Sequence, residues 1–262
     1  MSGSPTGSRL GFDEAGSGPL LILVHAFPLD RRMWRGQLQG LSDLRRVVAV
    51  DLRGRGRSAG LGDGAWGLDD HADDLAATVE SLGETQADFA GVSMGGYILF
   101  ALWRRHPECI RSLALIDTRA QDDPPEGKAN RERVAALAKE HGSSALVDEQ
   151  LPKLLGPAPG GQVQALVREM IEQTPGATAA ADSLAMRDRP DSVMDLTSVD
   201  VPALVIHGVD DAIVPLPQAE LMAELIPGAH FAPIPAAGHL APLENPEAVN
   251  LALRELLLRE ET

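Results

Sequence analysis

The sequence has one cysteine, Cys109, in 262 residues. No disulfide can form within the chain, and such a composition suits a reducing compartment. Aromatic residues make up only 3% of the chain, and every apolar run is far shorter than the roughly 20 residues of a membrane-spanning helix. Residues 1–18 have neither a basic leader nor an apolar core, so no signal peptide is expected. We therefore expect a cytoplasmic protein with no membrane as a partner.

Basic residues are also scarce. Lysine and arginine number 23 against 38 acidic residues, which gives a formal net charge of -15. Most of such a surface repels phosphate backbones and anionic lipids, so nucleic acid is not an expected partner. No cysteine and histidine cluster has the spacing of metal ligands, and we expect neither a metal nor a cofactor. The length favours one domain with an insertion over two equal domains. The sequence carries no signal for an oligomeric state.

Short runs rich in Val, Ile and Leu alternate with longer amphipathic segments. This alternation is typical of an α/β protein with a mostly parallel, doubly wound sheet covered by helices on both faces. Strands are predicted at residues 10–14, 20–25, 47–51, 89–92, 112–117, 203–207 and 231–235. Helices are predicted at residues 69–82, 97–105 and 246–259. Asn245 and Pro246 give the last helix a capping side chain and a proline at its first position.

The alternation stops after the fifth predicted strand. Residues 119–191 contain no strand-like run, and helix-like segments occupy 130–140, 145–155, 163–173 and 177–186. We predict a core domain of residues 1–118 and 192–262, with residues 119–191 inserted as a helical cap (lid) over one edge of the sheet. This cap is rich in Ala, Leu and Gly, which favours an apolar pocket beneath it.

The segment Gly91-Val-Ser-Met-Gly-Gly96 joins a predicted strand to a predicted helix. A serine in a Gly-x-Ser-x-Gly turn of this kind takes a strained backbone conformation. Its flanking glycines are needed because a Cβ would collide with the neighbouring strand or helix. Ser93 is therefore the predicted nucleophile.

A serine hydroxyl needs a base that takes its proton. In a parallel sheet, functional loops lie at the carboxyl ends of the strands, where Ser93 is found. His239 follows the last strand at that end and is the favoured base, while His25 and His207 end strands and stay geometrically possible. The remaining histidines are on helices, in the insertion or at the opposite end of the sheet: His71, His106, His141 and His230.

The histidine in turn needs a carboxylate that holds its tautomer and stabilises the imidazolium. Asp211, Asp210 and Asp117 all follow predicted strands, and the residue pattern alone leaves the choice among them open.

Donors for a developing oxyanion are also expected. The amide of Met94 begins the helix after Ser93, and the amide of Phe27 lies in the loop after the second strand. The predicted substrate contacts are Phe27, Trp34, Met94 and Leu240, with the core as an equal alternative for Trp34.

Further motifs accompany these candidates. They are His25-Ala-Phe-Pro-Leu-Asp30, Asp51-Leu-Arg-Gly-Arg-Gly-Arg-Ser58, Asp211-Ala-Ile-Val-Pro215, and His239 with Glu244-Asn-Pro246. With the turn around Ser93, they resemble the α/β-hydrolase superfamily, and within it small esterases, lactonases such as 3-oxoadipate enol-lactonase, and cofactor-free haloperoxidases. The resemblance implies an α/β-hydrolase fold with a helical cap. It maps the acid to Asp211, because the family places this residue four positions before the proline.

The resemblance implies a serine hydrolase that cleaves small carboxylic esters or lactones through an acyl-enzyme on Ser93. Two alternatives stay open: peroxide chemistry on the same triad, as in the cofactor-free haloperoxidases, and a ligand receptor on the hydrolase fold with incidental turnover. Haloalkane dehalogenase and epoxide hydrolase chemistry is disfavoured, because those relatives have an aspartate nucleophile where this chain has Ser93.

Overall fold

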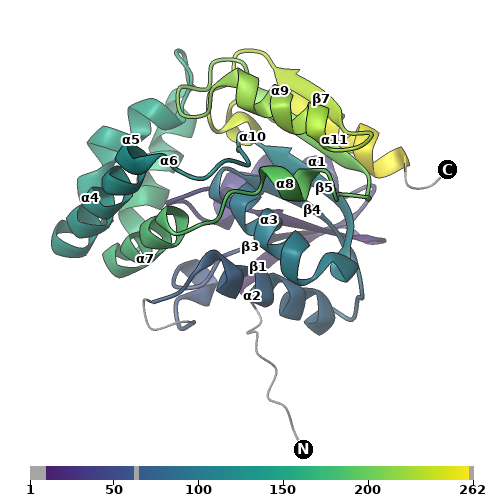
Figure 1. Ribbon diagram of the computed structural model, residues 1–262, viewed down its shortest axis with the longest axis horizontal. Coiled ribbons are helices and arrows are strands. Elements are labelled where there is room, and N and C mark those ends of the chain that lie inside the picture. Colours follow the sequence, from purple (N-terminus) through teal and green to yellow (C-terminus); the bar gives the residue numbers. More distant parts are fainter. Residues whose placement is uncertain (1–9, 62–64, 260–262) are drawn as a thin grey trace, which may run out of the picture.

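In the computed structural model, which describes residues 10–61 and 65–259, one mixed sheet runs through the molecule (Figure 1). Its strands are β1 (Phe12–Ala15), β2 (Leu20–Val24), β3 (Arg46–Val50), β4 (Ala87–Val92), β5 (Ile110–Ile116), β6 (Ala203–Gly208) and β7 (His230–Ile234). Their spatial order is β1-β3-β2-β4-β5-β6-β7. β1 pairs antiparallel with β3, and the other neighbours pair in parallel. The predicted mostly parallel α/β sheet is confirmed, with each strand within two residues of its predicted bounds.

Helices cover both faces of the sheet, which is why every residue of β2 and β4 is buried. α1 (Arg35–Gly40) packs with α11 (Pro246–Arg259) on one face. α2 (Leu68–Ser81), α3 (Met94–Arg105) and α9 (Leu216–Leu225) lie on the other (Figure 1). Short helical turns complete this part: η1 (Arg31–Trp34), η2 (Gly56–Ser58), η3 (Pro107–Cys109), α8 (Val193–Leu196) and α10 (Ala241–Glu244).

The three longest of these helices agree with the sequence patterns, and two of the shorter ones were missed for a physical reason. The helices predicted at 69–82, 97–105 and 246–259 correspond to α2, α3 and α11. The Asn245 side chain accepts a hydrogen bond from the Ala248 amide at 3.2 Å, so the predicted cap is confirmed. No helix was predicted for α8, α9 or α10. α8 and α10 are single turns, too short to show a helical period. Among the described residues, no helix is long and apolar enough to cross a membrane.

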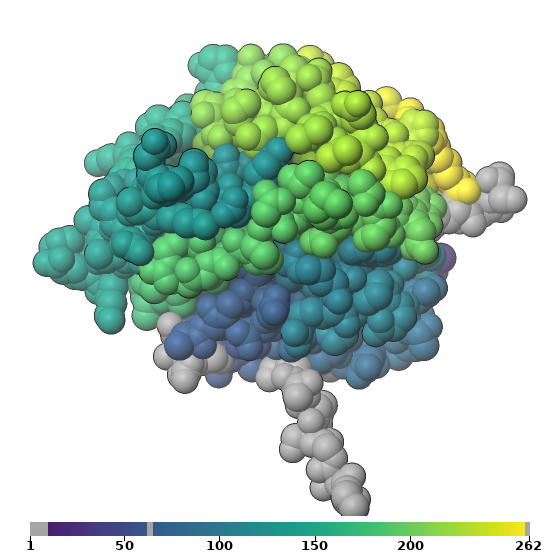
Figure 2. Space-filling view, in the orientation of Figure 1, coloured from purple at the N-terminus to yellow at the C-terminus, as the bar shows by residue number. Residues whose placement is uncertain are grey.

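Four longer helices come between β5 and β6. They are α4 (Pro125–His141), α5 (Val147–Leu154), α6 (Gly161–Gln173) and α7 (Gly176–Arg187), with η4 (Ser143–Leu146) before α5. They gather at one side of the sheet, on the left in Figures 1 and 2. Each corresponds to a predicted helix, although α4 begins five residues early because Pro125 occupies its first turn, where proline is tolerated. The division into a core domain and a cap domain stays a prediction.

A buried polar cluster connects α7 to the rest of the fold. The guanidinium of Arg55 is fully buried and pairs with the carboxylate of Asp182 on α7. Asp182 also accepts a hydrogen bond from Trp66 Nε1 at 2.8 Å and lies 3.2 Å from His71 Nε2. Burial lowers the pKa of Arg55 to about 10, and the group stays charged at neutral pH. Segment 51–58 therefore helps to hold the inserted helices.

Replacing Asp182 should destabilise the protein strongly. Asp182→Ala leaves Arg55 charged and unpaired in a buried site, which should lower the free energy of unfolding by about 3 to 5 kcal/mol. Asp188→Ala is a matched control, because this exposed carboxylate at the end of the same helix pairs with Arg187 and should cost at most about 1 kcal/mol. Urea denaturation followed by circular dichroism measures both. Equal losses in the two variants would contradict the importance of the buried pair.

Candidate active site

Ser93 occupies the sharp turn between β4 and α3. Its backbone has φ 54° and ψ -111°, a conformation that residues with a side chain rarely adopt. Two hydrogen bonds hold this turn: the Ser93 amide donates to the carbonyl of Ile116 at 2.9 Å, and Thr118 Oγ1 donates to the Ser93 carbonyl at 2.8 Å. The strained backbone predicted from the motif is confirmed.

The glycines around Ser93 allow the turn to pack closely. A Cβ on Gly91 would lie 2.6 Å from the carbonyl carbon of Gly95, and a Cβ on Gly95 would lie 2.4 Å from the carbonyl oxygen of Val24. Both distances are shorter than any tolerated contact. The predicted steric need for these glycines is therefore confirmed. Without side chains at these positions, the start of α3 packs against the end of β2.

His239 lies between Ser93 and Asp211. Its Nε2 is 2.8 Å from Ser93 Oγ, and its Nδ1 is 2.8 Å from Asp211 Oδ2. Because an ionised carboxylate only accepts hydrogen bonds, Nδ1 carries the proton in the neutral imidazole and Nε2 accepts from the serine hydroxyl. The other oxygen of Asp211 accepts from the amides of Ile213 at 2.7 Å and Val214 at 3.0 Å. The Asp211 carboxylate is thus held in one orientation.

The other candidate histidines are engaged elsewhere. His25 Nδ1 donates to the Ala26 carbonyl at 2.9 Å, and its Nε2 accepts from the Leu52 amide at 3.1 Å. Burial lowers the pKa of His25 to about 3, so this histidine stays neutral. His207 Nε2 donates to the Val214 carbonyl at 3.1 Å. Within the described chain, only the His239 side chain bonds to Ser93 Oγ.

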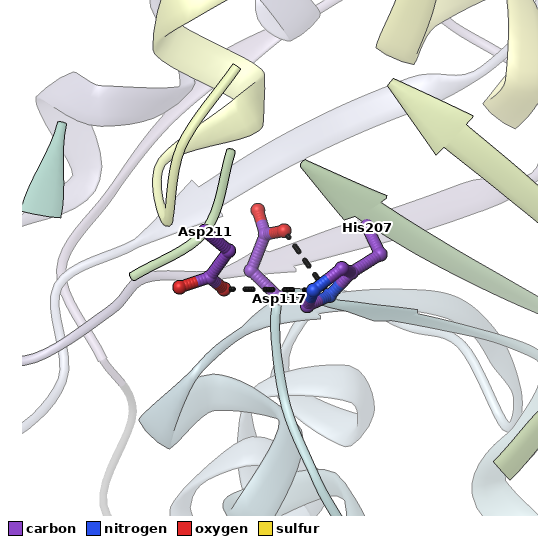
Figure 3. Close-up of side chains that lie close together, drawn as sticks. All are labelled: Asp117, His207 and Asp211. Atoms are coloured by element: carbon purple, nitrogen blue, oxygen red, sulfur yellow. Dashed lines mark ion pairs between the residues drawn. The ribbon is translucent and has the colours of Figure 1, made fainter. Parts of the chain in front are cut away.

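The rival carboxylates also have other places. Asp210 is exposed at the surface. Asp117 is buried beside His207 and Asp211, as Figure 3 shows, with His207 Nδ1 3.6 Å from its Oδ1. Its two oxygens accept from the amides of Gly208 at 2.7 Å and Ala241 at 3.1 Å. Asp117 therefore connects the end of β6 to the start of α10, just past His239.

The atoms of Asp117, His207 and Asp211 that could hold a metal ion lie within 4.8 Å of one another (Figure 3). All four carboxylate oxygens, however, already accept hydrogen bonds from backbone amides or from His239. This arrangement fits two carboxylates that fix the loops around His239. Burial and the nearby charge of Asp211 raise the pKa of Asp117 to about 7.

A third carboxylate fixes the loop that contains His239. Glu244 Oε1 accepts from the Gly238 amide at 2.9 Å, and its Oε2 accepts from the Gly156 amide at 2.7 Å. Gly156 follows α5, so Glu244 joins the inserted helices to the His239 loop. The Glu244-Asn-Pro motif carries this contact, which the sequence alone did not predict.

The charges around His239 favour its protonated form. Burial has the largest effect and lowers the pKa of His239, but the charge and hydrogen bond of Asp211 and the charge of Asp117 together outweigh burial. The net pKa lies above the usual 6.5. For Asp211, burial raises the pKa. The charge and hydrogen bond of His239 and the hydrogen bonds of the two loop amides lower the pKa by more, so the net shift is downward. An ionised carboxylate thus faces an imidazole that accepts a proton readily.

A cavity of about 210 Å³ opens onto Ser93 and His239. Its apolar wall comes from Phe27, Tyr97, Val134, Leu154, Met186 and Ile213. Its polar wall comes from Arg119, Asp123, Asn130, Arg131, Gln150 and Lys153. The cavity is therefore mixed, and the expected apolar pocket accounts for only one of its walls. Val134, Leu154 and Met186 of the insertion line the cavity, whereas others of its apolar residues, such as Met170 and Ile171, are buried in the core.

The predicted substrate contacts divide into two groups. Phe27 lines the cavity. Trp34, Met94 and Leu240 are fully buried and are not among the lining residues, so the cavity gives their predicted contact with substrate no support.

The predicted oxyanion donors are the amides of Phe27 and Met94. Neither donates a hydrogen bond to another group in the described part of the chain.

A sequence profile described as alpha/beta hydrolase fold matches residues 19–246. The chain belongs to the alpha/beta hydrolase family. The predicted family and fold are therefore confirmed.

The chain is also similar to individual proteins of this family over almost its whole length. A thermophilic esterase from Thermogutta terrifontis, with malate bound, is 41% identical with a TM-score of 0.93, over 97% of this chain and 94% of that one. The enol-lactonase from Burkholderia xenovorans LB400 is 28% identical with a TM-score of 0.85, over 95% and 96%. A non-heme haloperoxidase of Rhodococcus erythropolis is 29% identical over 94% of this chain and 95% of its own length.

Titration of His239 in this hydrolase tests the electrostatics. We expect its imidazole to titrate above pH 6.5 by NMR. Asp211→Asn removes the carboxylate charge while burial remains, so the pKa of His239 should fall below 6.5. Asp210→Asn is the matched control and should leave the titration unchanged, because Asp210 is exposed. A His239 pKa that stays above 6.5 in Asp211→Asn would refute the dominant influence of Asp211.

Proposed function

We propose that this hydrolase cleaves small carboxylic esters or lactones through an acyl-enzyme on Ser93. One observation carries the proposal: the hydrogen-bonded series from Asp211 through His239 to the hydroxyl of Ser93, which ends in a cavity large enough for a small molecule. The similarity to an esterase and to an enol-lactonase supports the same class of substrate.

The geometry supports a two-step reaction. Ser93 Oγ attacks the carbonyl carbon as His239 Nε2 takes its proton, and the tetrahedral intermediate then collapses with loss of the alcohol, which receives that proton from His239. A water molecule next attacks the acyl group, with His239 again as base, and releases the acid and Ser93. Asp211 keeps the proton on Nδ1 and stabilises the imidazolium in both steps.

The amides of Phe27 and Met94 are the proposed donors to the oxyanion. Met94 is the first residue of α3, where the N-terminal amides and the helix dipole favour negative charge. Phe27 follows β2, and the glycine contact between Gly95 and Val24 brings this loop next to the serine turn. Both amides can donate to a substrate oxygen, since neither donates a hydrogen bond to another of the described residues.

Replacement of the serine tests the nucleophile. Ser93→Ala should lower kcat for a short-chain nitrophenyl ester by a factor on the order of 10⁵ to 10⁶, because the attacking oxygen is lost. Its circular dichroism spectrum should match that of the wild type. Retained turnover would refute the nucleophile, whereas a wild-type protein that releases one equivalent of nitrophenol and then stops would support a receptor in place of an enzyme.

Two neighbouring aspartates test the acid. Asp211→Asn should lower kcat by about 10⁴-fold, because the amide favours the wrong tautomer of His239. Asp210→Asn should change kcat by less than about twofold, as is usual for an exposed residue away from the site. Steady-state kinetics on the same ester measure both. The reverse ranking would move the acid to Asp210.

Perhydrolysis is a second candidate, favoured by the similarity to the haloperoxidase. Hydrogen peroxide would then attack the acyl group on Ser93 in place of water, which releases a peracid and the free serine. The peracid would transfer one oxygen, with its proton, to a halide and leave a carboxylate and a hypohalous acid. Assays of ester hydrolysis and of halide oxidation with acetate and peroxide, run side by side, separate the two activities. Halide oxidation that is faster than hydrolysis and lost in Ser93→Ala would favour perhydrolysis.

A further inference from the structure

The cavity at Ser93 is more positive than the chain as a whole. Three cationic side chains line it, Arg119, Arg131 and Lys153, and the only carboxylate among the described lining residues is that of Asp123. Lys153 is itself 3.4 Å from Glu149, so the excess of positive charge comes from the two arginines. The whole chain has a net charge of -15. The positive charge at the cavity is therefore a local feature, opposite in sign to the charge of the whole chain.

Asp123 is shared by three arginines. Its oxygens lie 3.0 Å from Arg131 Nε and 3.0 Å from Arg189, and it also pairs with Arg119. In the described chain it is the only carboxylate within ion-pair distance of these three, and the adjacent Asp122 pairs with Lys128 at 2.7 Å. One carboxylate therefore pairs with three guanidinium groups, and the cluster keeps an excess of positive charge.

The two arginines at the cavity are partly withdrawn from water. The side chains of Arg119 and Arg131 are 18% and 23% exposed. The buried Nε of Arg119 has no hydrogen-bond partner among the described residues. Arginine is weakly hydrated and presents a planar fork of donors that matches a carboxylate, so these side chains are suited to an anion.

We propose that the substrates carry a carboxylate in addition to the ester that is cleaved, as in monoesters of short dicarboxylic acids. The carboxylate would bind at Arg119 and Arg131 while the ester carbonyl lies at Ser93. The cavity of about 210 Å³ is smaller than the roughly 300 to 1,000 Å³ of most ligand pockets, which limits the acyl part to a few carbons. The inference rests on the proposed ester hydrolysis.

Two esters of matched size test this preference. Monomethyl succinate carries the carboxylate, and methyl 4-oxopentanoate has a neutral acetyl group in its place. We expect kcat/KM to be about ten- to a hundredfold higher for the anionic ester, in the range of hydrogen bonds to a charged group. Arg131→Gln should reduce this ratio about tenfold.

Arg133→Gln is the matched control. It lies on the same helix, α4, but its exposed guanidinium pairs with Glu149 and it does not line the cavity. The ratio should therefore keep its wild-type value. A wild-type ratio near one, or an equal change in Arg131→Gln and Arg133→Gln, would overturn the inference and leave the proposed hydrolysis intact.

Binding of succinate separates this inference from the proposed function. Isothermal titration calorimetry on Ser93→Ala, with and without Arg131→Gln, needs no turnover. We expect succinate to bind Ser93→Ala and to bind the double variant about tenfold more weakly. If the wild type cleaves neither ester, the proposed hydrolysis fails. Equal affinity for succinate in Ser93→Ala and in the double variant would overturn the anion site.

Discussion

The hydrogen bond between His239 and Asp211 is the interaction around which the site is built. It joins two loops, after β6 and after β7, and it fixes the tautomer in which His239 Nε2 faces Ser93. Each end needs further support, because an imidazole and a carboxylate on mobile loops would rarely meet. The amides of Ile213 and Val214 hold the carboxylate, and the amide of Gly238, bonded to Glu244, holds the loop of the imidazole.

Carboxylates repeatedly connect separate segments in this protein. Asp117 joins Gly208 to Ala241, and Glu244 joins Gly156 to Gly238. A carboxylate suits this role because each of its two oxygens accepts amide hydrogens from a different segment. The cost is electrostatic: Asp117 lies near the charge of Asp211, and its pKa is raised to about 7. The charges of Asp211 and Asp117 both help to keep the pKa of His239 above its usual value. The carboxylates that support the loops therefore also affect the basicity of His239.

Charged side chains of the inserted segment meet the rest of the fold in two different ways. On one side, Asp182 of α7 neutralises the buried Arg55. On the other, α4, the segment before it and α5 place Arg131, Arg119 and Lys153 at the cavity with fewer acids than bases. The first contact is balanced in charge and the second is not. Balanced pairs are typical of structural contacts, whereas an excess of one sign in a concave site attracts ligands of the opposite sign.

The sequence by itself determined the sheet, its helices and the family. Strand and helix periods depend on local side-chain order, and the turn at Ser93 has a steric requirement that only its glycines meet, so both could be read from the residues. The residue pattern favoured His239 as the base but left His25 and His207 possible, and it left the choice among three aspartates open. The tertiary structure decided the contacts at those positions, because hydrogen-bond partners and burial come from segments distant in sequence. For the same reason composition suggested an apolar pocket, whereas the tertiary structure lines the cavity at Ser93 with arginine and lysine as well as with apolar side chains of the insertion.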